Sequence, residues 1–130
     1  MTAPLQADQA IPPKGTERYY QAVSSTLSNV DKFYRHFEVP GLGHCFGGRS
    51  GSLTTLFDQL RAWVENGTTP GAVPVEVTGL DGEVQKRVLC PYPQSAEHNT
   101  NGTFGVAAAG CWSCVDNPRR SLGAGVKEEL

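Results

Sequence analysis

Residues 33–48 read Phe-Tyr-Arg-His-Phe-Glu-Val-Pro-Gly-Leu-Gly-His-Cys-Phe-Gly-Gly. Its first part, Phe33–Val39, is rich in aromatic residues and predicts a β-strand that ends at Pro40. A glycine-rich loop follows and carries His44, with Cys45 directly after it. Small neighbours leave room over the imidazole, and histidine is the side chain that most often transfers protons in catalysis. The pattern indicates a catalytic histidine, although a single loop histidine usually has no such role.

Length, charge and hydropathy limit the classes of protein that this sequence can represent. The chain has 130 residues and a net charge of −2, which favours neither nucleic acid nor an anionic membrane as a partner. No apolar run approaches the ~18 residues of a membrane span, and residues 1–8 do not resemble a signal peptide. Four cysteines and the glycosylation sequons at Asn66 and Asn101 are nevertheless typical of secretion. We therefore expect a secreted-type chain that is a C-terminal piece of a longer enzyme or a mispredicted gene product.

Hydrophobic periodicity predicts helices and strands around the histidine loop, and hence an α/β fold. Helix caps are expected at Ser52 and Gly67, and a turn at Asp81-Gly82. The aromatic side chains expected in the core are Tyr19, Tyr20, Phe33, Tyr34 and Phe37. The predicted elements are a helix over Lys14–Leu27, the strand over Phe33–Val39 with His36 on one of its faces, a helix over Ser52–Asn66, a hairpin over residues 74–89, a loop over Ser95–Gly110 and a polar, disordered tail over residues 116–130.

Asp8 lies in a second loop of interest, because Pro12 and Pro13 prevent a helix until about Lys14. A carboxylate in such a loop can accept the Nδ1 proton of a histidine and so fix the tautomer of the ring. By itself, this loop is more typical of a solvated turn.

Cys111 and Cys114 have the spacing of half a zinc site or of a redox pair. A zinc site of this kind needs a second Cys-x-x-Cys, and a redox pair needs a following βα unit. The sequence shows neither, so both interpretations are disfavoured.

Residues 33–45 resemble the segment around the catalytic histidine of the tannase and feruloyl esterase family, Phe-Tyr-Arg-x-Phe-x-Val-Pro-Gly-x-Gly-His-Cys. Residues 7–13, Ala-Asp-Gln-Ala-Ile-Pro-Pro, resemble the family's aspartate loop, while Ala62–Gly67 and Leu89–Gln94 resemble its closing segments. The similarity covers residues 7–96 and extends more weakly to Val115. The resemblance implies that residues 1–115 are the C-terminal portion of a secreted α/β-hydrolase domain.

The same resemblance implies a Ser-Asp-His carboxylic ester hydrolase in which His44 is the base and Asp8 orients it. Its substrates would be hydroxycinnamoyl or galloyl esters derived from plant cell walls or tannins. The family's calcium site would lie in a lid that these 130 residues do not include, so no cofactor is expected for this chain.

The resemblance also implies a disulfide between Cys90 and Cys114, worth about 3 kcal/mol by chain entropy. It places Cys45 in a bridge to a cysteine beside the nucleophilic serine, which is not among these residues. Cys111 departs from the family pattern and could compete for Cys90 or capture Cys45.

A nucleophile elbow is missing from the sequence, which contains no Gly-x-Ser-x-Gly. Ser50 has the wrong spacing and follows His44, and only seven residues precede Asp8. We therefore expect these 130 residues alone to have no esterase activity above background. The alternative is a non-catalytic interaction fragment.

Overall fold

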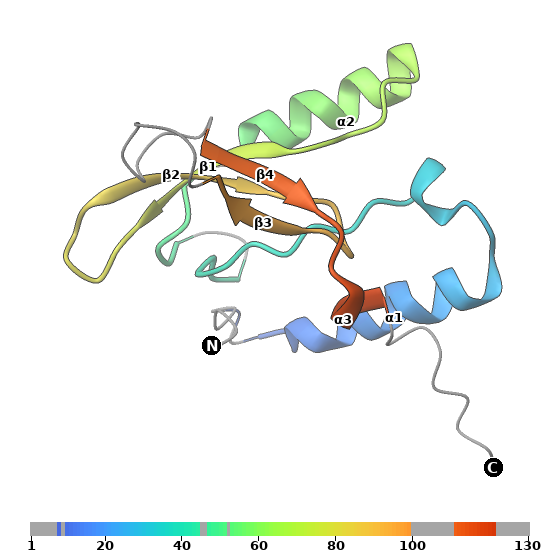
Figure 1. Ribbon diagram of the computed structural model, residues 1–130, viewed down its shortest axis with the longest axis horizontal. Coiled ribbons are helices and arrows are strands. Elements are labelled where there is room, and N and C mark those ends of the chain that lie inside the picture. Colours follow the sequence, from blue (N-terminus) through green and yellow to red (C-terminus); the bar gives the residue numbers. More distant parts are fainter. Residues whose placement is uncertain (1–7, 9, 45–46, 52, 100–110, 122–130) are drawn as a thin grey trace.

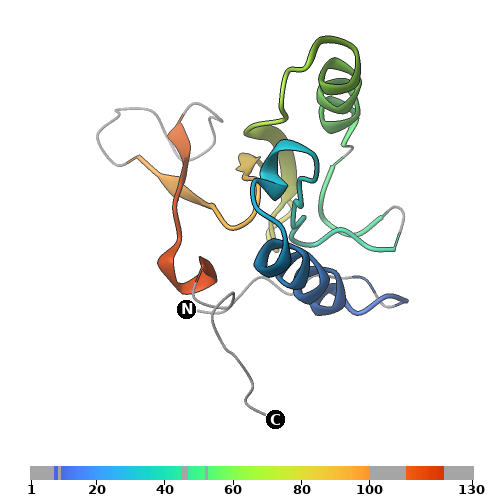
Figure 2. The same ribbon diagram turned by 90° about the vertical axis from the view of Figure 1, so that its right-hand side faces the viewer.

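A computed structural model describes residues 8, 10–44, 47–51, 53–99 and 111–121 of the chain. In chain order, the elements are α1 (Pro13–Thr26), a short 3-10 helix η1 (Val30–Lys32), α2 (Thr54–Asn66), β1 (Val73–Thr78), β2 (Val84–Leu89), β3 (Ser95–His98), β4 (Trp112–Val115) and α3 (Pro118–Ser121). The β1–β2 hairpin lies between α1 and α2 (Figure 1), and the β3–β4 pair lies to one side of it (Figure 2).

Both predicted helices are present. α1 begins at Pro13, one residue earlier than predicted, because a proline in the first turn lacks only an N–H that has no partner inside the helix. α2 ends at Gly67, whose φ of 70° is the left-handed conformation expected of a glycine after a helix. The residue before α2 is Leu53, and the predicted cap Ser52 lies outside the described residues.

The predicted hairpin is confirmed. β1 and β2 are antiparallel, from Val73 opposite Leu89 to Thr78 opposite Val84, and Gly82 in the turn has a φ of 85°. Glycine adopts this backbone conformation without the steric cost that a Cβ brings.

A second antiparallel pair corrects the predicted loop at Ser95–Gly110. Residues 95–98 form β3, which pairs with β4 so that Ala96 lies opposite Cys114. The sequence of β3 is Ser-Ala-Glu-His, which has no β-branched or large apolar side chain and so gives little strand signal. This segment is a strand because β4 pairs with it, and not because of its own composition. Residues 100–110 lie outside the described part of the chain.

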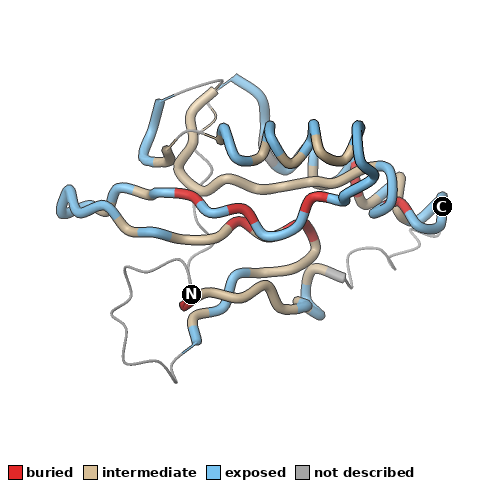
Figure 3. Tube along the Cα trace, turned by 90° about the horizontal axis from the view of Figure 1, so that it is seen from above, coloured by how far each residue is buried: buried red, intermediate tan, exposed pale blue. Residues whose placement is uncertain are grey.

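The core consists of two small clusters, and the described chain is exposed over much of its length (Figure 3). One cluster, centred on Tyr20 and Tyr92, joins α1 to the segment after β2. The other, centred on Val73, lies between the hairpin and α2. The predicted aromatic core is correct for Tyr20 and partly for Tyr34 and Phe37, but wrong for the two exposed side chains, Tyr19 and Phe33.

The segment 33–39 is not the predicted strand. Its sheet pairing in the described chain is a single bridge between Phe37 and Pro91, and Phe33 ends the 3-10 helix. The segment is nevertheless two-sided, since Phe37 and Val39 pack toward the hairpin whereas His36 stacks on the α1 side. A strand needs a ladder of hydrogen bonds with its neighbours, and aromatic residues alone do not supply one.

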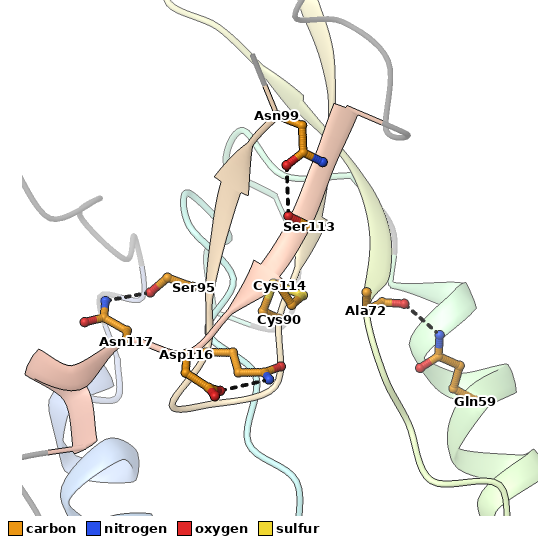
Figure 4. The surroundings of a disulfide bond; sticks show 10 residues. Gln59, Ala72, Cys90, Ser95, Asn99, Ser113, Cys114, Asp116 and Asn117 are labelled. Carbon is orange, nitrogen blue, oxygen red and sulfur yellow. Dashed lines mark hydrogen bonds between the residues drawn. A yellow bond between two sulfur atoms is a disulfide. The ribbon is translucent and has the colours of Figure 1, made fainter. Parts of the chain in front are cut away.

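The end of the described chain is ordered by a disulfide between Cys90 and Cys114, the pairing that the resemblance implied (Figure 4). Hydrogen bonds on the same side join Asn117 to Ser95, at 2.8 Å, and Gln94 to Asp116, at 3.2 Å. The prediction of a disordered tail is therefore wrong for residues 116–121, which include α3. Residues 122–130 lie outside the described part.

Candidate active site

Asp8 and His44 are brought together from positions 36 residues apart. The Nδ1 atom of His44 lies 3.2 Å from Oδ2 of Asp8, within hydrogen-bond range. The side chain of His44 is 39% exposed and that of Asp8 is 26% exposed, so the pair lies at the surface and is accessible to a reactant. The structure thus joins the two residues that the sequence singled out from separate loops.

The aspartate loop holds the carboxylate in its charged form. Oδ1 of Asp8 accepts hydrogen bonds from the backbone N–H groups of Ala10, at 2.8 Å, and Ile11, at 2.9 Å. These two donors, Ile11 first, are the main cause that lowers the pKa of Asp8, and the His44 contact adds to the effect.

The charge on Asp8 determines the tautomer of His44. An ionised carboxylate only accepts hydrogen bonds, so the proton of a neutral His44 ring lies on Nδ1 and points to Asp8. The lone pair is then on Nε2, the atom on which a base would take up a proton.

The histidine loop is closed by backbone hydrogen bonds. Gly43 donates its N–H to the carbonyl of Gly47, at 3.0 Å, and Arg49 donates to Gly41, at 2.7 Å. Gly41 and Gly48 both have positive φ angles, of 77° and 83°, which favour glycine. The glycines therefore allow the chain to turn back on itself tightly, and they also leave space around the imidazole.

The residues on both sides of this loop are hydrogen-bonded to the C-terminal half of the chain. After the loop, the chain pairs with β1, because Thr78 donates its N–H to the Arg49 carbonyl and Gly51 donates its N–H to the Glu76 carbonyl, each at 2.7 Å. Before the loop, the carbonyl of His36 accepts a hydrogen bond from the N–H of Tyr92, at 2.8 Å. The hairpin and the segment after it thus position His44 from a distance.

Glu38 supports segment 33–39, which leads into the histidine loop, and the sequence did not predict this role. Its side chain is 9% exposed and pairs with Arg120 of α3, while Lys14 of α1 lies 3.9 Å away. A carboxylate between Phe37 and Val39, in an otherwise apolar stretch, was the available signal. Its partner is 82 residues further along the chain, beyond any local pattern.

The other histidines have structural surroundings. His36 lies between the rings of Tyr20 and Tyr92, with centroids 5.7 Å from each. Burial lowers the pKa of His36, against the opposing effect of the Glu38 charge. His98 packs edge-on against Trp112. Among the histidines of this chain, the aspartate contact belongs to His44.

The remaining predicted residues are placed as follows. Cys45 and Asn101 lie outside the described residues, whereas Asn66 is exposed at the end of α2. Cys111 is buried and does not compete for Cys90, because Cys90 is bonded to Cys114. This bond also contradicts a redox pair of Cys111 with Cys114.

Within the described ranges, no group of three or more His, Cys, Asp or Glu side chains is placed to hold a metal ion. No helix among the same residues has the length and apolar character that a membrane crossing requires. No serine in this part of the chain is hydrogen-bonded to His44, and the Oγ of Ser50 is buried away from solvent without a partner.

An ionised carboxylate beside Nδ1 of an imidazole is the acid–base pair used by hydrolases that activate a nucleophile. Residues 4–115 match the family model described as "Tannase and feruloyl esterase". The chain therefore belongs to the tannase and feruloyl esterase family.

Individual relatives agree with this assignment. Mono(2-hydroxyethyl) terephthalate hydrolase of Piscinibacter sakaiensis is 32% identical over 106 residues, which are 78% of this chain and 17% of that protein. Feruloyl esterase B of Aspergillus niger is 29% identical over 83% of this chain and 24% of its own length. The crystal structure of an esterase from Aspergillus oryzae matches with a TM-score of 0.64 and 26% identity, over 83% of this chain and 25% of that one. The chain thus spans a quarter or less of these proteins.

Proposed function

We propose that this chain supplies the acid–base half of a carboxylic ester hydrolase, with His44 as the general base and Asp8 as its orienting carboxylate. The observation that carries the proposal is the 3.2 Å contact between His44 Nδ1 and Asp8 Oδ2. It occurs between two loops that each have the form of a family motif, in a chain that belongs to this family.

In the proposed reaction, Nε2 of His44 removes the proton of a serine hydroxyl as its oxygen attacks the ester carbonyl. The protonated ring then gives the proton to the leaving alcohol, and the Asp8 carboxylate stabilises the imidazolium between these steps. Water, activated by His44 in the same way, hydrolyses the acyl-enzyme. The serine belongs to a part of the enzyme outside these 130 residues, so the chain by itself is inactive.

The substrates that we propose are aromatic esters, of the hydroxycinnamoyl or galloyl type. Similar proteins are described as a feruloyl esterase and as a tannin acyl hydrolase, both from Aspergillus niger. Such esters are derived from plant cell walls and tannins, which fits a secreted enzyme with glycans at Asn66 and Asn101 and with the Cys90–Cys114 disulfide.

The proposal is tested in a chimera of Aspergillus niger feruloyl esterase B in which residues 4–115 of this chain replace the matching segment. We expect hydrolysis of methyl ferulate that falls by about 10³-fold or more in His44→Ala, because the base is lost. His98→Ala is the matched control, since His98 lies against Trp112 and away from Asp8. It should keep activity within about twofold, a change of less than 0.5 kcal/mol in the barrier.

Two results would contradict the proposal. The first is a folded chimera whose activity is equally reduced by His44→Ala and His98→Ala. The second is ester hydrolysis by the unmodified 130-residue chain that disappears in His44→Ala, because a serine within these residues would then be the nucleophile.

A further inference from the structure

His36 is enclosed by two tyrosine rings on the α1 side of segment 33–39. The centroid of its imidazole lies 5.7 Å from those of Tyr20 and Tyr92, and both of these tyrosines are buried. Its backbone carbonyl accepts a hydrogen bond from Tyr92, so the backbone and the ring are both held in place. The Nε2 atom is nevertheless buried without a hydrogen-bond partner among the described residues. A proton gained at this ring must therefore change its surroundings.

Glu38 follows two residues later and lies on the same side of the extended segment. Its side chain and that of His36 line one hollow of about 250 Å³. Oε2 of Glu38 pairs with Arg120 of α3, whereas Oε1 is buried without a hydrogen-bond partner, and the Lys14 Nζ atom is 3.9 Å from it. Two residues that border the same hollow thus each carry a buried polar atom that makes no hydrogen bond in the described structure.

The charges around His36 are balanced while its ring is neutral. The charged groups that act most strongly on the ring are the carboxylates of Glu38 and Glu17 and the cations of Arg120 and Lys14. Lys14 pairs with Glu17 on α1, and Arg120 pairs with Glu38. Protonation of His36 adds a third cation to these two pairs. Burial lowers the pKa of His36, and the Arg120 and Lys14 charges add to this effect against the two carboxylates.

A protonated His36 has a new requirement for an acceptor. Both ring nitrogens of an imidazolium carry a proton, so the buried Nε2 becomes a donor. Glu38 offers an oxygen without a hydrogen bond on the same side of the segment, whereas Glu17 already binds Lys14. The imidazolium therefore competes with Arg120 for the carboxylate of Glu38, and it also repels the guanidinium.

The helix α3 depends on Arg120 for its position. It has a single turn, and so short a helix does not persist without tertiary contacts. Arg120 pairs with Glu38, its guanidinium lies 5.5 Å from the centroid of the Tyr92 ring, and its carbonyl accepts a hydrogen bond from the Tyr92 hydroxyl, at 3.1 Å. Both partners of Arg120 are also neighbours of His36, so a change at the imidazole reaches the contacts that hold α3.

We propose that His36 is a proton-operated switch for the attachment of α3. The neutral ring leaves Glu38 to Arg120, and the helix is attached. The protonated ring takes Glu38 as its own partner and repels Arg120, and the helix is released. The proton comes from solvent and stays on the imidazole, so no covalent bond other than N–H changes. No step requires Asp8 or His44, and the switch is therefore independent of the proposed esterase function.

Release of α3 requires mildly acidic solution. The pKa of His36 lies below the ordinary value of about 6.5, so the ring is neutral at pH 7. The unfolded chain binds this proton first as the pH falls, because its histidine has the ordinary pKa. The contribution of neutral His36 to stability is therefore complete above the unfolded pKa and is lost as the pH falls through the folded one.

The switch is tested by an NMR titration of the 130-residue chain from about pH 7.5 to about pH 4.5. The ring carbons of His36 report protonation, and contacts between the Arg120 side chain and the Tyr92 ring report attachment of α3. We expect both to change with one midpoint, below a pH of about 6.5, while the Cα shifts of β1 and β2 stay constant. Contacts that persist after His36 is protonated, or that are lost at a different pH, would overturn the proposal.

His36→Gln removes the titrating group and should shift the loss of these contacts downward by about one pH unit or more. His98→Gln is the matched control, because His98 packs on Trp112, and it should leave the midpoint unchanged. An unchanged midpoint in His36→Gln would show that another group releases the helix and would overturn the proposal.

Arg120→Gln provides a second test that does not depend on how well His36→Gln folds. Coupling between two sites is reciprocal, so removing the guanidinium should raise the pKa of His36. Arg119→Gln removes a positive charge from the neighbouring position of α3 and should change that pKa less. An equal effect of the two substitutions would reduce the coupling to the general charge of α3 and overturn the specific link between His36 and Arg120.

Discussion

A Cβ atom on Gly48 would lie 2.1 Å from the carbonyl oxygen of Gly41. The two glycines face each other where the histidine loop closes, through the bridge between Leu42 and Gly48. Real Cβ atoms do not approach a backbone oxygen so closely, and both glycines belong to the loop that carries His44. The loop can therefore adopt this backbone conformation only with glycine at position 48.

Gly48→Ala should destabilise the chain by roughly 3 kcal/mol or more, since the backbone itself must shift. Gly47→Ala is the matched control: its φ of 80° is as unfavourable for alanine, but nothing lies within 4 Å of the added Cβ. That variant should lose only about 1–2 kcal/mol. Urea unfolding measures both, and equal losses would show that the approach to Gly41 does not matter.

The histidine loop also shows how far sequence alone could lead. The motif placed His44 on a loop and Asp8 in a second one, but their contact depends on the two loops folding toward each other. Local patterns gave the helices and the hairpin, because periodicity and turn residues act over short distances. Segment 33–39 was predicted as a strand because its composition suits one, although among the described residues its sheet pairing is the single bridge between Phe37 and Pro91.

The lowered pKa of Asp8 makes part of the stability pH-dependent. Its folded-state pKa lies below the unfolded value of about 3.9, so the unfolded chain takes up the proton first as the pH falls. The contribution of Asp8 is therefore complete above the unfolded pKa and disappears as the pH falls through the folded one. Asp8→Asn should be less stable than wild type at pH 7, with the gap closing in acid.

The measurement is urea unfolding from pH 7 to pH 2, together with an NMR titration of the Asp8 carboxyl carbon. Asp58→Asn, on the exposed side of α2, is the control for the removal of one carboxylate elsewhere in the chain. In His44→Ala the pKa of Asp8 should stay low, because the N–H groups of Ala10 and Ile11 are the larger cause. Its return to the ordinary value would mean that the histidine dominates.

The pair of Glu38 with Arg120 should couple α3 to the histidine segment. Arg120→Gln leaves the nearly buried Glu38 carboxylate without this partner and should cost on the order of 2 kcal/mol. Glu38→Gln leaves the more exposed Arg120 side chain and should cost less. The double variant should cost less than the sum, because the lost interaction is counted once. Arg119→Gln, on an exposed neighbour in α3, should change stability by less than about 0.5 kcal/mol.

This double-mutant cycle is measured by urea unfolding at neutral pH. Additive losses would show that Glu38 and Arg120 act separately. The pair also explains why the tail was mispredicted: residues 116–121 look polar and free in the sequence, and their order comes from partners at positions 38, 94 and 95.

The disulfide should be the largest single contribution to the order of β3 and β4. Cys90 and Cys114 are separated by 24 residues, and closing a loop of this length limits the unfolded chain by about 3 kcal/mol. The Cys90→Ser, Cys114→Ser variant should therefore lose about that much in urea unfolding. β3 has little strand propensity of its own, so its amides should show the greatest gain in hydrogen exchange, while those of α2 change little. Reductant should lower the stability of wild type to that of the variant and leave the variant unaffected. A wild type insensitive to reductant would show that β3 and β4 hold together without the bond.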